Sequence, residues 1–162
     1  EILDEVNCRK VVFIDACKSG ATTLTRLASQ RKDYQFMVSC SPEEVSHEDT
    51  LWQNGAFTRA LLEAFGTVEV LPGKRPEKTD LNDDRVLNLK EVFAYVRTRV
   101  PALIKTKKPR VKESQTPFMP SNDDFPLFAL YQERTKNELQ NPDNQIKKPE
   151  GGMDGEAKKG NQ

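Results

Sequence analysis

The feature that most constrains this fold is an apolar run followed at once by a polar turn. Four consecutive branched or aromatic residues, Val11 to Ile14, predict a strand that is buried on both faces. Such strands are typical of mostly parallel sheets covered by helices. Asp15, Cys17 and the residues up to Gly20 follow the strand directly, at the end where open α/β sheets gather ligands and catalytic groups. The sequence therefore predicts an α/β fold with a site at the carboxyl end of this strand.

Cys17 is the candidate nucleophile of this turn. The thiolate is the reactive form of cysteine, and a neighbouring cation such as Lys18 or a helix N-terminus favours it. The backbone amides of Ser19 and Gly20 can form an oxyanion hole, since glycine lets a substrate carbonyl approach the main chain closely. The alternative is that Cys17 is a small apolar residue at a strand end.

Several segments of the chain resemble one enzyme family and occur in the family's order. Residues 15–20, Asp-Ala-Cys-Lys-Ser-Gly, are similar to the Asp-x-Cys-His-Ser-Gly signature of metacaspases and bacterial caspase-family proteases, and to the Gln-Ala-Cys-x-Gly signature of animal caspases. Residues 38–46 resemble the family's next core strand with its loop, and residues 55–62 resemble the helix that follows. Residues 115–117 and 124–127 resemble its closing segment.

The resemblance implies a caspase-like three-layer sandwich, in which a mostly parallel sheet is flanked by helices, and a cysteine endopeptidase activity. Cys17 would be the nucleophile, and Lys18, Ser19 and Gly20 would form the active-site turn. In this family the catalytic histidine lies some 50 residues before the cysteine, whereas sixteen residues precede Cys17 here. We therefore expect a partial domain over residues 1–131, without its N-terminal strands. The histidine of the Cys–His dyad would lie on a segment outside this chain.

His47 is the sole histidine in the sequence and follows the cysteine. A dyad is recognised by geometry and not by order, so the sequence alone leaves His47 open as the base. The family comparison instead makes it a surface loop residue near the substrate cleft.

Asp15 carries the expectation about substrate specificity. It lies two residues before Cys17, so the two side chains point to the same strand face. A carboxylate there can pair with a cationic residue of a protein or peptide substrate, and the position resembles the acidic pocket residue of metacaspases. We expect cleavage after arginine or lysine, although Asp15 can alternatively cap local backbone amides. The long polar loop that begins at Cys40 supplies further substrate-binding candidates: Ser41, Glu43 and Glu44.

An acidic stretch raises the question of a metal. A calcium-binding EF-hand loop has oxygen ligands at positions 1, 3, 5 and 12, which correspond here to Asp80, Asn82, Asp84 and Glu91. However, Arg85 stands where that loop requires glycine, and no helix is expected before it. We favour a capping box of Asn88 and Glu91 at the start of a helix over residues 89–104. No cofactor is then required, and calcium stays an alternative as an activator.

The hydrophobic pattern predicts the remaining elements. Residues 35–39 predict a second central strand, residues 56–65 an amphipathic helix that Gly66 ends, and residues 127–131 a last strand. Pro101 is expected to kink the helix over residues 89–104 or to end its regular part. Residues 132–162 lack aromatics and are rich in polar residues, which predicts a disordered tail.

Composition excludes some classes of partner. Lysine plus arginine and aspartate plus glutamate both number 25, so the net charge of zero gives no reason to expect nucleic-acid or membrane binding. No apolar run is long enough to span a bilayer, and no signal peptide is visible. Three cysteines without a framework spacing indicate a reducing compartment, and hence the cytoplasm. Two other functions stay open: a non-catalytic caspase-fold scaffold and, with less support, a phosphate-binding module.

Overall fold

The structure is a computed structural model that describes residues 5–16, 26–28, 30–107, 109, 111–121 and 123–130. The turn from Cys17 to Gly20, with Lys18 and Ser19, lies outside the described residues, as does the polar tail over residues 132–162. Residues 1–130 form one compact unit, and the elements below belong to it.

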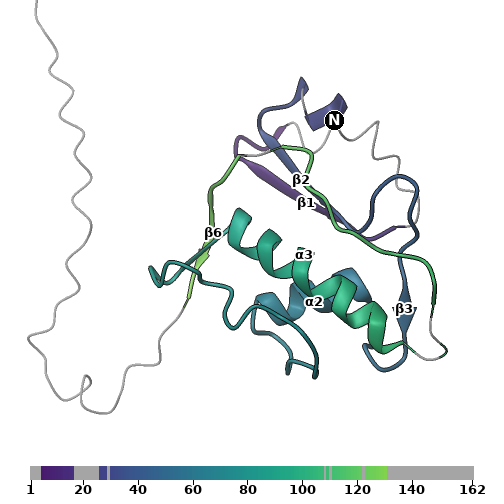
Figure 1. Ribbon diagram of the computed structural model, residues 1–162. Coiled ribbons are helices and arrows are strands. Elements are labelled where there is room, and N and C mark those ends of the chain that lie inside the picture. Colours follow the sequence, from purple (N-terminus) through teal and green to yellow (C-terminus); the bar gives the residue numbers. More distant parts are fainter. Residues whose placement is uncertain are drawn as a thin grey trace, which may run out of the picture. The chain divides into compact units, whose positions relative to one another are not determined.

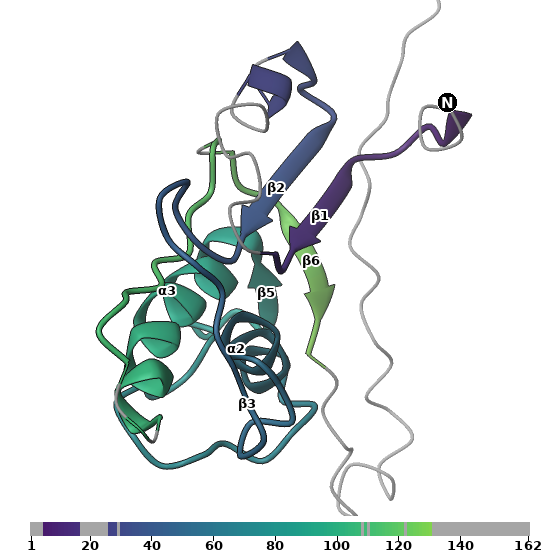
Figure 2. The same ribbon diagram turned by 90° about the vertical axis from the view of Figure 1, so that its right-hand side faces the viewer.

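Two parallel strands lie at the start of this unit. β1 (Lys10–Ile14) pairs with β2 (Tyr34–Val38), and Ile14 lies opposite Val38; Figure 2 shows both strands running in the same direction. All five residues of β2 are buried, which confirms the predicted central strand. The prediction that β1 is buried on both faces is wrong, because Phe13 is 37% exposed. Among the described residues β1 pairs with β2 alone, so one edge of β1 has no partner strand there.

Side chains alternate across this strand pair and form two separate hydrophobic clusters. On one face, Val11 and Met37 pack with the helices. On the other face, Val12 and Ile14 join β2 side chains and Phe118 in a second cluster. The strand pair is therefore a layer with apolar packing on both of its faces.

The other described strand pairs are antiparallel. β3 (Glu48–Asp49) pairs with β4 (Asn54–Gly55), and β5 (Val86–Asn88) pairs with β6 (Pro126–Ala129). β6 confirms the predicted last strand, shifted toward the N-terminus by one or two residues. The fold is thus mixed α/β with small sheets, and in the described residues the parallel arrangement is confined to β1 and β2.

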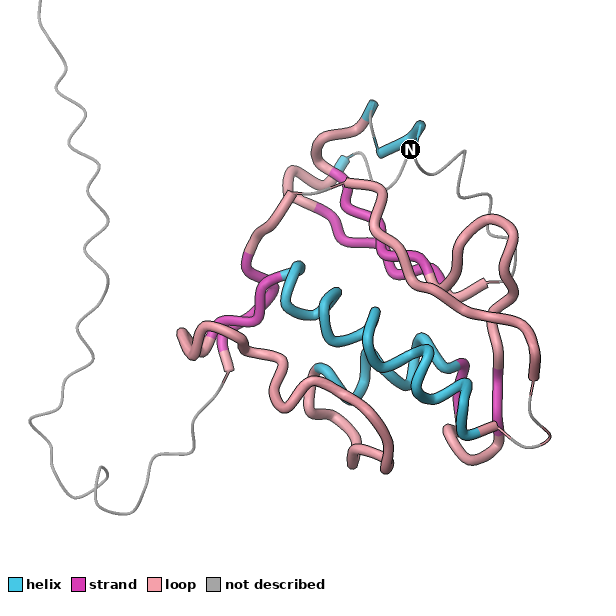
Figure 3. The backbone as a smooth tube through the Cα atoms, in the orientation of Figure 1, coloured by secondary structure: helices cyan, strands magenta, loops and turns pink. Residues whose placement is uncertain are grey.

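Two helices form the main core of the unit. α2 (Ala56–Ala64) buries its apolar face against α3 (Leu89–Thr106), and Figures 1 and 3 show the two helices beside each other on one side of the β1–β2 pair. Gly66 has a φ of +68° directly after α2, which confirms the predicted glycine stop. No described helix is long and apolar enough to cross a membrane.

The start of α3 is as predicted and its end is not. Asn88 and Glu91 form the capping box, in which the Asn88 amide donates to Glu91 Oε2 at 3.0 Å. The helix continues through Pro101 to Thr106, so of the two expectations for Pro101, a kink or an end of the regular part, the second is wrong. Proline removes one backbone hydrogen bond, and the burial of Val100 and its neighbours on the same face offsets that loss.

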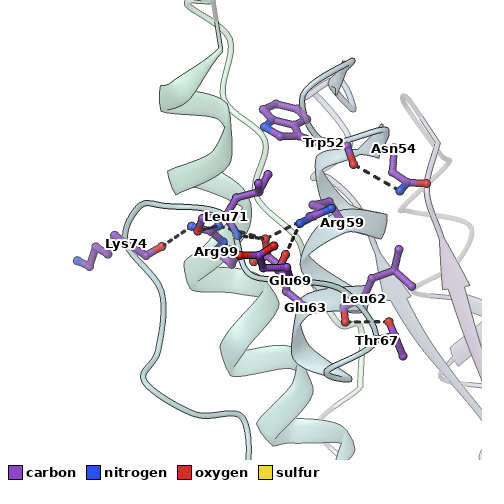
Figure 4. Close-up of polar contacts among 10 residues, drawn as sticks. All are labelled: Trp52, Asn54, Arg59, Leu62, Glu63, Thr67, Glu69, Leu71, Lys74 and Arg99. Carbon is purple, nitrogen blue, oxygen red and sulfur yellow. Dashed lines mark hydrogen bonds and ion pairs between the residues drawn. The ribbon is translucent and has the colours of Figure 1, made fainter.

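A charged cluster lies between the two helices (Figure 4). The Glu63 carboxylate of α2 accepts hydrogen bonds from Arg99 of α3, from Arg59 one turn earlier and from the Leu71 amide. The two guanidinium groups also donate to backbone carbonyls of the following segment, namely those of Glu69, Leu71 and Lys74. The cluster therefore ties residues 69–74, which form neither helix nor strand, to both helices.

Candidate functional site

Asp15 follows β1 directly and reaches the start of α2. Its Oδ2 accepts a hydrogen bond from Thr58 Oγ1 at 2.6 Å and from the Thr58 amide at 3.3 Å. Thr58 lies in the first turn of α2, where free backbone amides and the helix dipole favour a negative charge. The carboxylate is therefore held at a fixed place at the carboxyl end of β1.

Gly55, the residue before α2, makes room for this carboxylate. A Cβ atom added at Gly55 would lie 2.5 Å from Asp15 Oδ2, which is closer than real Cβ contacts come. Glycine is thus the residue that lets the strand end and the helix start approach each other here.

An open polar cavity of about 710 Å³ adjoins Asp15. Its described lining residues come from the end of β1, from β3, β4 and the turn between them, and from α2: Asp15, Glu48, Asp49, Thr50, Gln53, Asn54, Gly55 and Thr58. Three of these are carboxylates, and none of the described lining residues is basic. Such a cavity attracts a cationic group and repels an acidic one. We refer to it as the acidic pocket.

The sequence reasoning had not singled out Glu48, Asp49, Gly55 or Thr58 as site residues. The sequence does carry one indication, because Glu48 and Asp49 are adjacent acids shortly before the helix that begins at Ala56. What the sequence did not show is that this helix start folds back onto the end of β1.

The three loop candidates lie elsewhere. Glu44 accepts hydrogen bonds from Ser114 Oγ at 2.6 Å, from the Thr116 amide at 2.6 Å and hydroxyl at 2.9 Å, and from the Ser41 amide at 3.2 Å. Burial raises the pKa of Glu44, but these hydrogen bonds together outweigh it and the pKa lies below its ordinary value. Glu43 is exposed, and Ser41 Oγ donates to the Thr116 carbonyl at 3.5 Å. Of the four substrate-binding candidates, only Asp15 lines the acidic pocket.

The sequence matches the model of the caspase domain, peptidase C14, over residues 3–128. The chain belongs to the caspase domain family. Comparisons with curated proteins and with solved structures gave no match. Membership confirms the predicted resemblance; it implies the caspase fold and peptide substrates in general, and it suggests a cysteine peptidase.

His47 of this caspase domain has a buried side chain, so the expectation of a surface residue is wrong. The loop is drawn inward because the His47 amide donates to Gln115 Oε1 at 2.9 Å and its carbonyl accepts the Ala56 amide at 2.8 Å. Burial lowers the pKa of His47, nearby Lys107 lowers it further, and Glu113 opposes these effects. The Nε2 atom has no hydrogen-bond partner among the described residues. His47 is therefore neutral at pH 7, and it is not among the residues that line the acidic pocket.

The acidic stretch of the caspase domain uses its oxygens to hold backbone amides. Asp80 Oδ2 accepts the Arg85 amide at 2.9 Å, and Asp84 Oδ1 accepts the Val86 amide at 2.7 Å. Glu91 accepts the Leu81 amide at 2.8 Å in addition to that of Asn88. Asn82 Oδ1 likewise accepts the Asp84 amide. Within the described residues, no group of three or more acidic, histidine or cysteine side chains is placed to hold a metal ion.

Proposed function

We propose that this caspase domain is a cysteine endopeptidase that cleaves peptide bonds after arginine or lysine, with Cys17 as the nucleophile. The observation that supports this most is the acidic pocket at the end of β1, because Asp15 lines it and stands two residues before Cys17. A guanidinium or ammonium group in the pocket would make charge-assisted hydrogen bonds to the carboxylates. An acidic side chain there would meet three like charges.

The reaction would proceed by covalent catalysis. The Cys17 thiolate attacks the scissile carbonyl, a C–S bond forms, and the carbonyl oxygen becomes an oxyanion that the amides of Ser19 and Gly20 stabilise. A histidine supplied from outside this chain takes the thiol proton and donates it to the amine as the C–N bond breaks, which leaves a thioester on Cys17. Water then hydrolyses the thioester, which releases the carboxylate product and restores the thiol. No cofactor takes part in these steps.

The segment that carries the histidine would also complete the three-layer sandwich. Under this proposal the mostly parallel sheet extends beyond β1 and β2, with the domain covering residues 1–131 of this chain and the polar tail lying outside it. A nucleophilic thiol also suits a reducing compartment such as the cytoplasm.

The test uses two fluorogenic peptides that end in arginine or in aspartate and are otherwise identical. The full-length gene product that contains this chain is assayed beside its Cys17→Ala variant. We expect hydrolysis of the arginine peptide alone, and none with Cys17→Ala. Hydrolysis of the aspartate peptide would contradict the specificity, and hydrolysis of neither would favour the non-catalytic scaffold.

A further inference from the structure

The residue before Cys17 is held by a buried side chain of the neighbouring strand. Ser39 comes directly after β2 and has no solvent exposure. Its Oγ lies 3.2 Å from the Ala16 amide, from which it accepts, and 3.3 Å from the Ala16 carbonyl, to which it donates. The Ser39 amide in turn donates to the Ile14 carbonyl at 2.9 Å. The Ser39 side chain therefore extends the hydrogen bonding between the two strands beyond the last backbone pair of β1 and β2.

Other groups fix Ser39 itself. Ser46 Oγ lies 2.5 Å from Ser39 Oγ, and Gln115 Nε2 donates to the Ser39 carbonyl at 3.1 Å. Cys40 adds a weak contact, with its Sγ 3.6 Å from the Ala16 carbonyl oxygen. Ser39 thus has a single position from which its hydroxyl can reach Ala16.

The contact satisfies the buried Ser39 hydroxyl, and it also fixes the position of the Ala16 peptide groups. Ala16 is exposed, so water could satisfy its amide and carbonyl if Ser39 were absent. Water would satisfy the two groups without fixing their position. A side chain that fixes an exposed backbone unit next to a nucleophile matters for geometry more than for stability.

We propose that Ser39 is a positioning residue, which sets the place and the reactivity of the Cys17 thiol by holding the Ala16 peptide groups. This inference rests on the proposed function, since it assigns Ser39 a part in the same reaction. Ser39 is assigned no part in bond making or bond breaking. Its effect reaches Cys17 through the covalent bond between Ala16 and Cys17.

The experiment compares the full-length gene product with Ser39→Ala, Ser39→Thr and Ser46→Ala variants. Ser39→Ala removes the contact with Ala16, and Ser39→Thr keeps a hydroxyl there. Ser46→Ala removes one of the contacts that fix Ser39 and leaves the bonds between Ser39 and Ala16 in place. The measured quantities are kcat and KM for the arginine peptide, and amide hydrogen exchange at Ala16 by NMR.

We expect Ser39→Ala to lower kcat about tenfold or more, with KM little changed, because a small displacement of a reacting group costs rate more than binding. Exchange of the Ala16 amide should become faster in the same variant. Ser39→Thr should recover most of kcat, and Ser46→Ala should lower kcat less than Ser39→Ala does, because the bonds between Ser39 and Ala16 remain. If Ser39→Ala does not fold, Ser39→Cys takes its place, since it keeps a weak donor of similar size.

Alkylation of Cys17 by iodoacetamide separates failure of this inference from failure of the proposed function. Its rate is followed for Cys17 alone by peptide-resolved mass spectrometry from about pH 5 to about pH 9, the range in which thiols titrate. A changed pH profile in Ser39→Ala supports positioning even if the wild type hydrolyses neither peptide. An unchanged kcat and an unchanged alkylation profile in a folded Ser39→Ala variant overturn it, whether or not arginine cleavage is observed.

Discussion

Glu63 and Arg99 form an ion pair that solvent does not reach, with 2.6 Å between Glu63 Oε2 and Arg99 Nε and no exposure of either side chain. The pair joins α2 to α3 in the middle of the core. Both Glu63 oxygens accept hydrogen bonds, and Arg59 provides a second guanidinium. A buried carboxylate with this many donors stays charged, and the pKa of Glu63 is accordingly lowered: burial raises it, but the Arg99 contact and the other donors outweigh that effect.

Replacing Arg99 by methionine should lower the free energy of unfolding by about 3 to 5 kcal/mol, because it leaves the Glu63 charge buried without its main partner. Urea denaturation followed by circular dichroism measures the loss. The surface pair of Lys78 and Asp83 provides the control. Lys78→Gln should leave the unfolding midpoint unchanged. If both variants lose the same free energy of unfolding, burial does not make the Glu63–Arg99 pair stronger than a surface pair.

The hydrogen bonds between Glu44 and residues 114–116 should contribute to the free energy of unfolding in a way that depends on pH. The folded-state pKa of Glu44 lies below its ordinary value of 4.5, so the stability that it contributes is fully present above that value. This stability is lost as the pH falls through the folded-state pKa. The difference in unfolding free energy between wild type and Glu44→Gln should therefore be largest near neutrality and shrink in acid. Denaturant titrations at several pH values measure it, with the exposed Glu43→Gln as the control; a difference that grows in acid would contradict the argument.

Substitution of Asp15 by asparagine should lower kcat/KM for the arginine peptide by about tenfold to a hundredfold, because a charged pair with the substrate is lost. The same substitution also weakens the bond to Thr58. Thr58→Val separates the two effects, since it removes the hydroxyl and keeps the Asp15 charge.

Gly55→Ala is a second variant that tests the role of Asp15 in the acidic pocket. The added methyl group would displace the Asp15 carboxylate, and kcat/KM for the arginine peptide should fall although every charge is kept. If both Asp15→Asn and Gly55→Ala hydrolyse the arginine peptide at the wild-type rate, Asp15 does not bind the substrate cation.

Replacement of His47 by glutamine should leave the arginine peptidase activity within about threefold of wild type, an allowance for a small effect on packing. His47 is buried and held through its backbone, whereas a general base needs a side chain that reaches the thiol proton. Steady-state kinetics beside Cys17→Ala provide the check. A His47→Gln enzyme that is as inactive as Cys17→Ala would identify His47 as the base after all.

Removal of calcium should not change the activity. Asp80 Oδ2, Asp84 Oδ1 and both Glu91 oxygens already accept backbone amides, and binding of a cation through these atoms would require these bonds to break. Assays in excess EDTA and in added calcium, together with thermal melts, test this. A calcium requirement that Asp80→Asn abolishes would instead assign a metal site to this loop.

The elements that depend on local pattern could be predicted from the sequence. The apolar run before Asp15 indicated β1, and periodicity with the Asn88–Glu91 capping box located α2 and the start of α3. Burial was less predictable, because it depends on neighbours in space. Phe13 looked like a core residue and is partly exposed, and His47 looked like a surface residue and is buried.

The candidate site was predictable only at Asp15. The other acids of the pocket, Glu48 and Asp49, lie far from Asp15 along the chain. Two adjacent acids before a helix are commonly part of a solvent-exposed turn. The contact between Ser39 and Ala16 was equally hidden, since a serine after a strand carries no signal of which backbone group it will meet. These relations depend on how β1, β2 and α2 meet, which local pattern does not encode.

The charged cluster around Glu63 also determines which parts of the domain open together. Residues 69–74 have no ladder or helical turn of their own, yet their carbonyls are bound by guanidinium groups whose charges are neutralised inside the core. If this segment separated from the helices, the guanidinium groups of Arg59 and Arg99 would lose these hydrogen bonds beside the buried Glu63 carboxylate. The segment therefore belongs to the same cooperative unit as α2 and α3, so that local fraying there is suppressed and its backbone becomes accessible to proteases only when both helices come apart.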